Sequence, residues 1–268
     1  MALPAGFVEV RRSREVAWIR ADLEPLGLDA LWAAPEPLPF AKGRGGIGQL
    51  QLRPDLCAVV RQLRRGGAFG KLLGDRYPAP ARVRRELEVL TRLREEGVPV
   101  VAPLAALARR PRTFWRLRLL TELAAGAQPL PAFCAADPEA RRWAIEAAAV
   151  TIRLAFAAGL RHPDLHPDNV LVSRSGDKVR AVLVDLDRAE LVPVLTAQQR
   201  DTMLVRMARY LWRHRRTLPV AFTRVDLMRF LRALGEAPRA PRKLRFRELQ
   251  QKLERALKQR GLLPTERG

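Results

Sequence analysis

The sequence lacks several features that would restrict its function. Only two cysteines, Cys57 and Cys134, occur in 268 residues. They are too few and too far apart for a disulfide framework or a CxxC metal site, which fits a reducing compartment. No apolar run reaches the roughly 18 residues that a membrane-spanning helix needs. No apolar segment follows basic residues at the start, as it would in a secretory signal. These absences favour a globular protein of the cytoplasm.

Acidic residues and lysine are scarce. The formal net charge is +21, from 49 basic and 28 acidic residues, and only 6 of the basic residues are lysine. Residues 201–268 hold 18 basic and 6 acidic residues, whereas residues 1–40 are slightly acidic. Such an excess predicts an anionic partner, either nucleic acid, an anionic membrane surface or a phosphorylated substrate. Arginine enrichment by codon bias is the alternative, because electrostatics alone would accept lysine.

Hydrophobic periodicity predicts a strand-rich first third and a mostly helical remainder. Strands are expected at residues 56–61 and 115–123, helices at 80–96, 138–158 and from 196 onward, and a hairpin at 170–184. Breaks in the last helical region are expected near Pro219 and at 235–241. This order predicts an α+β chain with two lobes.

The most informative segment is His162-Pro163-Asp164-Leu165-His166-Pro167-Asp168-Asn169, which has the spacing H-x-D-L-x-x-x-N. Asp185 follows sixteen residues after Asn169. This spacing around a hairpin is typical of the catalytic and metal-binding loops of the protein-kinase-like fold. Asn169 and Asp185 would supply hard oxygen ligands to Mg²⁺, and Asp164 would accept the proton of an acceptor hydroxyl. The alternatives are polar residues that cap turns and a zinc site that includes His162 and His166.

Further parts of a kinase site are expected upstream. Gly43, Gly45 and Gly48 match a glycine-rich loop that lets backbone N–H groups approach phosphates, although glycine clusters are also common in turns. Arg61 ends Ala58-Val59-Val60-Arg61, where kinases carry lysine, and would pair with nucleotide phosphates. Glu86 on the following helix is the expected carboxylate partner of Arg61, because Glu88 points elsewhere on that helix.

A hinge is expected where the last strand of the first lobe ends. Backbone groups of Glu122 and Leu123 could hold an adenine ring there, although an ordinary buried strand end is equally consistent with the sequence. The predicted lobes are residues 1–123, with the glycine-rich loop, and residues 124–268, with the catalytic and metal-binding loops. Together they would form one kinase-like domain. Residues 1–40 and the last 70 carry no motif that we can assign.

Over residues 40–192 the chain resembles the lipopolysaccharide kinase family. The resemblance extends beyond the kinase motifs to a set of segments in the first lobe and to the Asp-Leu-Asp ending of the metal-binding loop. These segments are Val60-Arg61-Gln62-Leu63-Arg64-Arg65-Gly66-Gly67, Gly70-Lys71-Leu72, Asp75-Arg76-Tyr77, Glu86-Leu87, Gly97-Val98-Pro99-Val100 with Pro103, and Asp185-Leu186-Asp187.

The resemblance implies a protein-kinase-like two-lobed fold with a small antiparallel sheet in the N-lobe and a mostly helical C-lobe. It also implies Mg²⁺-dependent transfer of the ATP γ-phosphate to a hydroxyl of 3-deoxy-D-manno-octulosonic acid (Kdo) on a lipid A precursor. The enzyme would then work on the cytoplasmic face of the bacterial inner membrane. Its expected partners are this anionic glycolipid and an anionic membrane surface, with no nucleic acid and no obligate protein partner.

The segment after Asp185 favours a small acceptor. It contains no Ala-Pro-Glu motif and no Ser, Thr or Tyr before Thr196, whereas a protein kinase needs a peptide-docking platform there. The alternatives are a heptose kinase of the same family, an atypical protein kinase, a pseudokinase and a basic nucleic-acid-binding module. Intact Asp164, Asn169 and Asp185 count against a pseudokinase, and no aromatic-rich RNA motif supports nucleic-acid binding.

Overall fold

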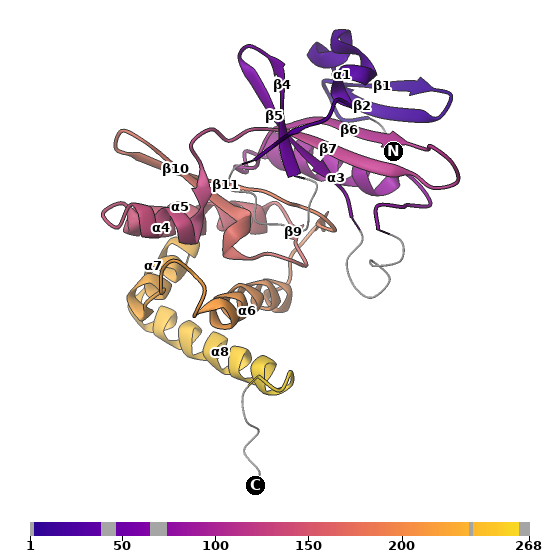
Figure 1. The fold of residues 1–268 in the computed structure, drawn as a ribbon. Coiled ribbons are helices and arrows are strands. Elements are labelled where there is room, and N and C mark those ends of the chain that lie inside the picture. The colour runs from indigo at the N-terminus through magenta and orange to yellow at the C-terminus, as the bar shows by residue number, and fades with distance from the viewer. Residues whose placement is uncertain (1–2, 39–46, 65–73, 236–237, 263–268) are drawn as a thin grey trace. The chain divides into compact units, whose positions relative to one another are not determined.

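The computed structural model describes residues 3–38, 47–64, 74–235 and 238–262 (Figure 1). The chain divides into two compact units. The first comprises Met1–Glu95 and Val101–Ala124, and the second comprises Glu96–Val100 and Ala125–Gly268. The short segment Glu96–Val100 belongs with the second unit because Val100 forms an isolated parallel bridge with Leu183 and the Pro99 carbonyl accepts the N–H of Leu183 at 2.9 Å.

The first unit is built on a seven-stranded antiparallel sheet with the strand order β1-β2-β6-β7-β5-β4-β3 (Figure 1). Its strands are β1 (Phe7–Arg12), β2 (Glu15–Arg20), β3 (Glu36–Pro37), β4 (Ile47–Arg53), β5 (Leu56–Gln62), β6 (Pro103–Arg109) and β7 (Arg116–Glu122). Its helices are η1 (Ala21–Leu26), α1 (Gly27–Leu31) and α3 (Ala81–Glu95). The small antiparallel sheet expected for an N-lobe is confirmed.

Helix α3 packs on this sheet through one apolar face. Val83, Leu87, Leu90 and Leu93 recur every three or four residues and are at most 1% exposed. The helix contacts β6 and β7. Burying each such side chain contributes about 1.5–3 kcal/mol, so the sheet and the helix fold as one layered core.

Residues that carried no recognisable motif form the edge of the sheet. Strands β1 and β2 make an antiparallel hairpin, and β2 pairs with β6 in the same sheet. Strand β2 is almost entirely buried, and Leu23, Leu28 and Leu31 from η1 and α1 join the same core. Residues 7–31 are thus structural in the first unit.

The second unit is mostly helical and contains one embedded hairpin, as predicted. Its helices are α4 (Leu130–Ala136), α5 (Arg141–Ala157), η2 (Pro167–Asn169), α6 (Ala197–His214), α7 (Arg224–Leu234) and α8 (Arg239–Lys258). Its strands are β8 (Gln128–Pro129), β9 (Leu160–Arg161), β10 (Val170–Ser175), β11 (Lys178–Leu183) and β12 (Glu190–Leu191). Among the residues described, every helix is too short or too polar to cross a bilayer.

Helix α5 packs against the β10–β11 hairpin through its buried face. Small residues on that face, Ala144 and Ala148, are fully buried and let the helix approach β11 closely. Thr151 adds a buried hydrogen bond from its Oγ1 to the carbonyl of Ala181 at 3.0 Å. The strands that lead into and out of the motif residues therefore rest on a rigid helix.

Gly159 permits the sharp turn of the chain after the end of α5. Its φ is +76°, and a Cβ there would lie 2.0 Å from the carbonyl oxygen of Val192. Only glycine combines a left-handed backbone with such a close approach. The Gly159 carbonyl accepts the N–H of Val192 at 2.9 Å, which joins β12 to the start of β9.

Candidate active site

The hairpin register brings Asn169 and Asp185 to the same end of the hairpin. Strands β10 and β11 pair over six residues, from Val170 with Leu183 to Ser175 with Lys178. One step beyond the first pair, the N–H of Val184 donates to the carbonyl of Asn169 at 3.0 Å. Asn169 precedes one strand and Asp185 follows the other by two residues, so both lie at the open end.

Asn169 also fixes the position of Asp164. Its side-chain Nδ2 donates to the Asp164 backbone carbonyl at 3.1 Å, while its own backbone N–H donates to the His166 carbonyl at 3.0 Å. Asn169 is only 7% exposed. Because the side-chain nitrogen of Asn169 donates its hydrogen bond to the loop, the side-chain oxygen is the atom that could bind a cation.

The donor set at the open end fits Mg²⁺ better than zinc. Asp185 and Asn169 offer oxygen, the ligand type that hard cations prefer. Within the described ranges no group of three or more His, Cys, Asp or Glu side chains is placed to hold a metal. Two protein ligands suit a cation that takes its other ligands from nucleotide phosphates and water. The alternative of a zinc site that includes His162 and His166 gains no support from these residues.

Backbone strain is concentrated at Asp185 and in the turn that follows it. Asp185 and Arg188 are the non-glycine residues with positive φ among those described, at 55° and 62°. A left-handed conformation costs a residue with a Cβ roughly 1–2 kcal/mol. Such strain is found at functional sites, where the surrounding structure holds it in place.

Asp164 presents its carboxylate to solvent and to one arginine. Its side chain is 65% exposed. Arg206 from α6 donates from Nε to Oδ1 of Asp164 at 3.2 Å, and its Nη2 lies 3.1 Å from the same oxygen. The carboxylate is therefore accessible from solvent, and Arg206 orients it.

His162 anchors the start of the loop that carries Asp164, as a neutral imidazole. It is 1% exposed, and its Nδ1 accepts the Asp164 N–H at 3.2 Å. Burial lowers the pKa of His162 to about 4, although the charges of Asp185 and Asp164 oppose the shift. A neutral ring that accepts at Nδ1 carries its proton on Nε2, so this histidine positions the loop without adding charge.

Helix α6 braces the same loop with residues that the sequence did not predict. Met203 Sδ lies 3.2 Å from the His162 backbone nitrogen. Tyr210 stacks on His166 with 4.6 Å between ring centroids and donates its hydroxyl to Asp168. Burial, and then the hydrogen bond to Asp168, raise the pKa of Tyr210, so its hydroxyl stays protonated as a donor.

In the first unit, Arg61 and Glu86 form the expected ion pair. Arg61 on β5 donates from Nη2 to Glu86 Oε1, and the two side chains are 19% and 3% exposed. Glu88, which we expected to face elsewhere, pairs with Arg84 at 2.9 Å. The carboxylate thus holds the Arg61 guanidinium against α3.

Gly48 occupies a crowded position in the sheet. It pairs with Pro37 on β3 and Val60 on β5, and a Cβ would lie 2.5 Å from the carbonyl oxygen of Glu36. This packing alone requires glycine. Gly43 and Gly45 lie outside the described residues.

The expected hinge residues use their backbone N–H groups within the first unit. The N–H of Glu122 donates to Ala102 O at 2.8 Å, and that of Leu123 donates to Cys57 O at 2.9 Å. An adenine contact at these two residues would therefore have to use other backbone groups.

Comparisons with known proteins identify relatives of the chain. A model described as "Lipopolysaccharide kinase (Kdo/WaaP) family" matches residues 31–234. The 3-deoxy-D-manno-octulosonic acid kinase of Vibrio vulnificus strain CMCP6 is 36% identical over 136 residues, which are 49% of this chain and 57% of the relative. The enzyme of the same name from Xylella fastidiosa strain M23 is 32% identical over 206 residues, which are 75% and 80% of the two chains.

A solved structure shares the fold. It is titled "WaaP in complex with acyl carrier protein", has a TM-score of 0.58 and 21% identity, and covers 88% of this chain and 92% of its own. The fold class is therefore the α+β protein-kinase-like fold. The segment matched to the Vibrio relative spans little more than half of that relative's length, so the acceptor has to be argued from the site.

The buried histidine predicts a stability change on acidification. The folded pKa of His162, about 4, lies below the ordinary value of 6.5, so the unfolded chain binds the proton first. The free energy of unfolding should fall as pH drops below about 6.5, by at most about 1.4 kcal/mol per unit for this residue. Burial also lowers the pKa of His166, which acts in the same direction.

Urea unfolding of the wild type and of His162→Gln at pH 7.0 and 5.5 measures this change. The variant should lose less stability on acidification than the wild type does. Equal losses for the two proteins would contradict the assignment of His162 as a buried neutral residue.

Proposed function

This chain belongs to the lipopolysaccharide kinase (Kdo/WaaP) family, and we propose that it transfers the γ-phosphate of ATP to a hydroxyl of Kdo in the lipopolysaccharide inner core. One observation supports the chemistry most strongly. The hairpin places Asn169 and Asp185 together, and the Asn169 side chain ties the Asp164 loop to them. A proton acceptor and two oxygen ligands in this relation are what phosphoryl transfer requires.

In the proposed reaction, Asp164 takes the proton of the acceptor hydroxyl. The acceptor oxygen forms a bond to the γ-phosphorus while the bond from that phosphorus to the bridging oxygen breaks, and the electron pair leaves with ADP. Asn169 and Asp185 would hold Mg²⁺, which neutralises phosphate charge when it is bound. Arg206 keeps the Asp164 carboxylate in one orientation through its hydrogen bond.

Arg61 and Glu86 would serve the nucleotide. Arg61 retains the positive charge that kinases place beside the α- and β-phosphates, and Glu86 holds its guanidinium in position. An arginine fork can contact two phosphate oxygens through parallel hydrogen bonds of fixed geometry, whereas a lysine acts as a point charge. We propose that Gly43, Gly45 and Gly48 approach the phosphates, and that backbone groups near Glu122 and Leu123 contact the adenine.

Kdo is the proposed acceptor because of the named relatives and the short segment before α6. Two curated relatives are 3-deoxy-D-manno-octulosonic acid kinases. Only ten residues separate Asp185 from Thr196, the N-cap of α6, which leaves little chain for a peptide platform. The alternative acceptors are a heptose and a protein, and the assay below distinguishes both from Kdo.

The expectation of no obligate protein partner stays a prediction, because the solved neighbour is a complex with acyl carrier protein.

A position on the cytoplasmic face of an anionic membrane is proposed from a group of arginines. Arg209 of α6 lies close enough to Arg206, Arg213 and Arg260 to be influenced by their charges. Burial, followed by the charges of Arg260, Arg206 and Arg213, lowers the pKa of Arg209. Clustered arginines of this kind are drawn to anionic headgroups, by about 1 kcal/mol for each residue near the surface.

The acceptor is tested by incubating the purified chain with Mg²⁺ and ATP and one of three acceptors. These are a Kdo-bearing lipid A precursor, a heptosylated core acceptor and a generic protein substrate. Mass spectrometry should show one added phosphate on the Kdo-bearing acceptor. Asp164→Asn should lower kcat by about 100-fold or more because the proton has no acceptor. Phosphate on another acceptor alone, or full turnover by Asp164→Asn, would refute the proposal.

Membrane binding is tested by sedimentation with vesicles that contain increasing fractions of anionic lipid. Binding should rise with anionic lipid and fall with salt. Arg213→Gln/Arg260→Gln should weaken it about 30-fold at low salt, since two charges near the surface are lost. The matched control, Arg142→Gln/Arg180→Gln, removes two exposed arginines elsewhere and should bind as the wild type does. Equal losses for both pairs would contradict a specific membrane-facing surface.

A further inference from the structure

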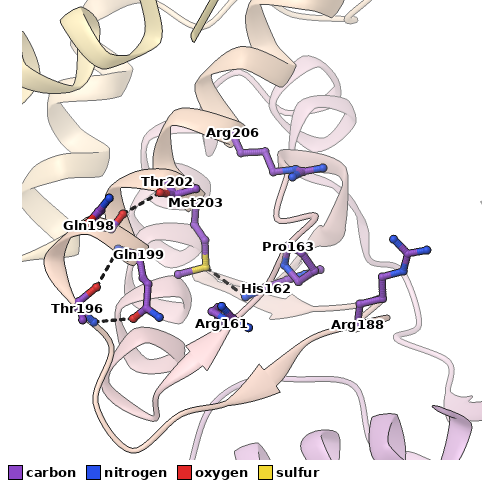
Figure 2. Close-up of a pocket in the computed structure, with 10 residues that line it drawn as sticks. All are labelled: Arg161, His162, Pro163, Arg188, Thr196, Gln198, Gln199, Thr202, Met203 and Arg206. Carbon is purple, nitrogen blue, oxygen red and sulfur yellow. Dashed lines mark hydrogen bonds between the residues drawn. The ribbon is translucent and has the colours of Figure 1, made fainter. Parts of the chain in front are cut away.

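A pocket of about 580 Å³ opens beside Asp164, wholly within the second unit (Figure 2). Its wall is formed by β9, the start of the catalytic loop, the turn after Asp185, and α6 with its N-cap. This volume lies in the range of small-molecule sites, roughly 300–1,000 Å³. Arg206 joins the pocket to the active site because it both lines the pocket and hydrogen-bonds to Asp164.

The pocket is basic. Its lining includes Arg161, Arg188 and Arg206, and none of the described residues that line it is acidic. Arg161 is paired with Glu190, and Arg206 with Asp164. Within the described part of the chain Arg188 makes no ion pair or hydrogen bond. One of the three guanidinium groups is therefore available for an external anion.

Arg188 is also held in a strained backbone conformation. Its φ is 62°, and the N–H of the next residue, Ala189, closes a turn onto the Leu186 carbonyl at 2.9 Å. Arg188 lies on this turn and Arg206 on α6, so the two lining arginines come from different elements (Figure 2). Non-glycine residues in this conformation cluster at active sites and ligand-binding sites.

We propose that this pocket holds the acceptor sugar acid, with its carboxylate bound by Arg188 and a ring hydroxyl directed at Asp164. The inference rests on the proposed function, since an octulosonic acid is a sugar that carries a carboxylate. A guanidinium fork matches a carboxylate with two parallel hydrogen bonds. The side chain of Gln198, also in the lining, offers a donor and an acceptor to sugar hydroxyls.

The pocket thereby explains how a small acceptor is oriented without a peptide platform. A carboxylate bound at the turn after Asp185 fixes one end of the sugar. The remaining hydroxyls then lie toward the loop that carries Asp164. Arg188 is a binding residue in this account, so its loss should affect acceptor affinity far more than turnover.

Steady-state kinetics with two soluble acceptors test the pocket, namely the methyl glycoside of Kdo and its C1 carboxamide. For the wild type, the KM of the carboxamide should exceed that of the carboxylate about 10- to 100-fold, the loss expected for a charged hydrogen bond. Arg188→Met should raise the KM of the carboxylate by a similar factor. It should leave the KM of the carboxamide, the KM of ATP and kcat near their wild-type values.

Three further variants separate binding from structure. Arg188→Lys keeps the charge without the fork and should restore part of the affinity. Arg188→Gly relieves the left-handed backbone and should unfold no earlier than the wild type, yet it should show the raised KM. Arg142→Met, an exposed arginine on α5 stacked over Trp143, is the matched control and should change nothing.

Three results would overturn the inference. A wild type that accepts the carboxylate and the carboxamide with equal KM does not use the carboxylate. A variant Arg188→Met that weakens both acceptors equally acts through structure. If the wild type phosphorylates no Kdo acceptor, lipid-linked or soluble, the proposed function fails first and the sugar-acid assignment fails with it.

Discussion

The whole candidate site depends on the pairing of β10 with β11. That pairing, from Val170 with Leu183 outward, continues into the hydrogen bond between the Val184 N–H and the Asn169 carbonyl. It brings together two residues that are sixteen positions apart in the sequence, Asn169 and Asp185. A shift of the register by one residue would turn the side chains of the shifted strand to the opposite face, and Asn169 and Asp185 would separate. The hairpin is therefore the element that brings the separated residues of the sequence motif together in space.

Around the hairpin, the second unit combines rigid, neutral support with exposed charge. Ala144, Ala148 and Thr151 on α5 hold β11 from a buried face. His162 is buried as a neutral ring, so it fixes the loop without adding a charge. Asp164, in contrast, is mostly exposed and remains accessible to an acceptor. This separation of buried positioning groups from exposed polar groups suits the transfer to a glycolipid that we propose.

Local spacing made the motif residues predictable from sequence. The pattern from His162 to Asn169 and the Asp-Leu-Asp ending are contiguous, and the hairpin follows from alternating apolar residues around a Ser-Gly-Asp turn. The choice of Glu86 over Glu88 followed from helix geometry. Met203, Arg206 and Tyr210 were not predicted, because α6 begins more than 25 residues after Asn169 and periodicity does not reveal which turn meets the loop. The left-handed backbone of Arg188 also depends on tertiary geometry and was not predicted. The same is true of the hydrogen bonds that occupy the N–H groups of Glu122 and Leu123.

Calorimetric titration of Mg²⁺-ATP into the wild type, Asp185→Asn and Asp164→Asn tests the central claim most directly. The claim is that the open end of the hairpin holds the metal and that Asp164 serves the acceptor. Asp185→Asn should bind ATP with little dependence on Mg²⁺, whereas Asp164→Asn should retain the Mg²⁺-dependent affinity of the wild type. Unchanged Mg²⁺-ATP affinity in Asp185→Asn, or an equal loss in both variants, would contradict the account.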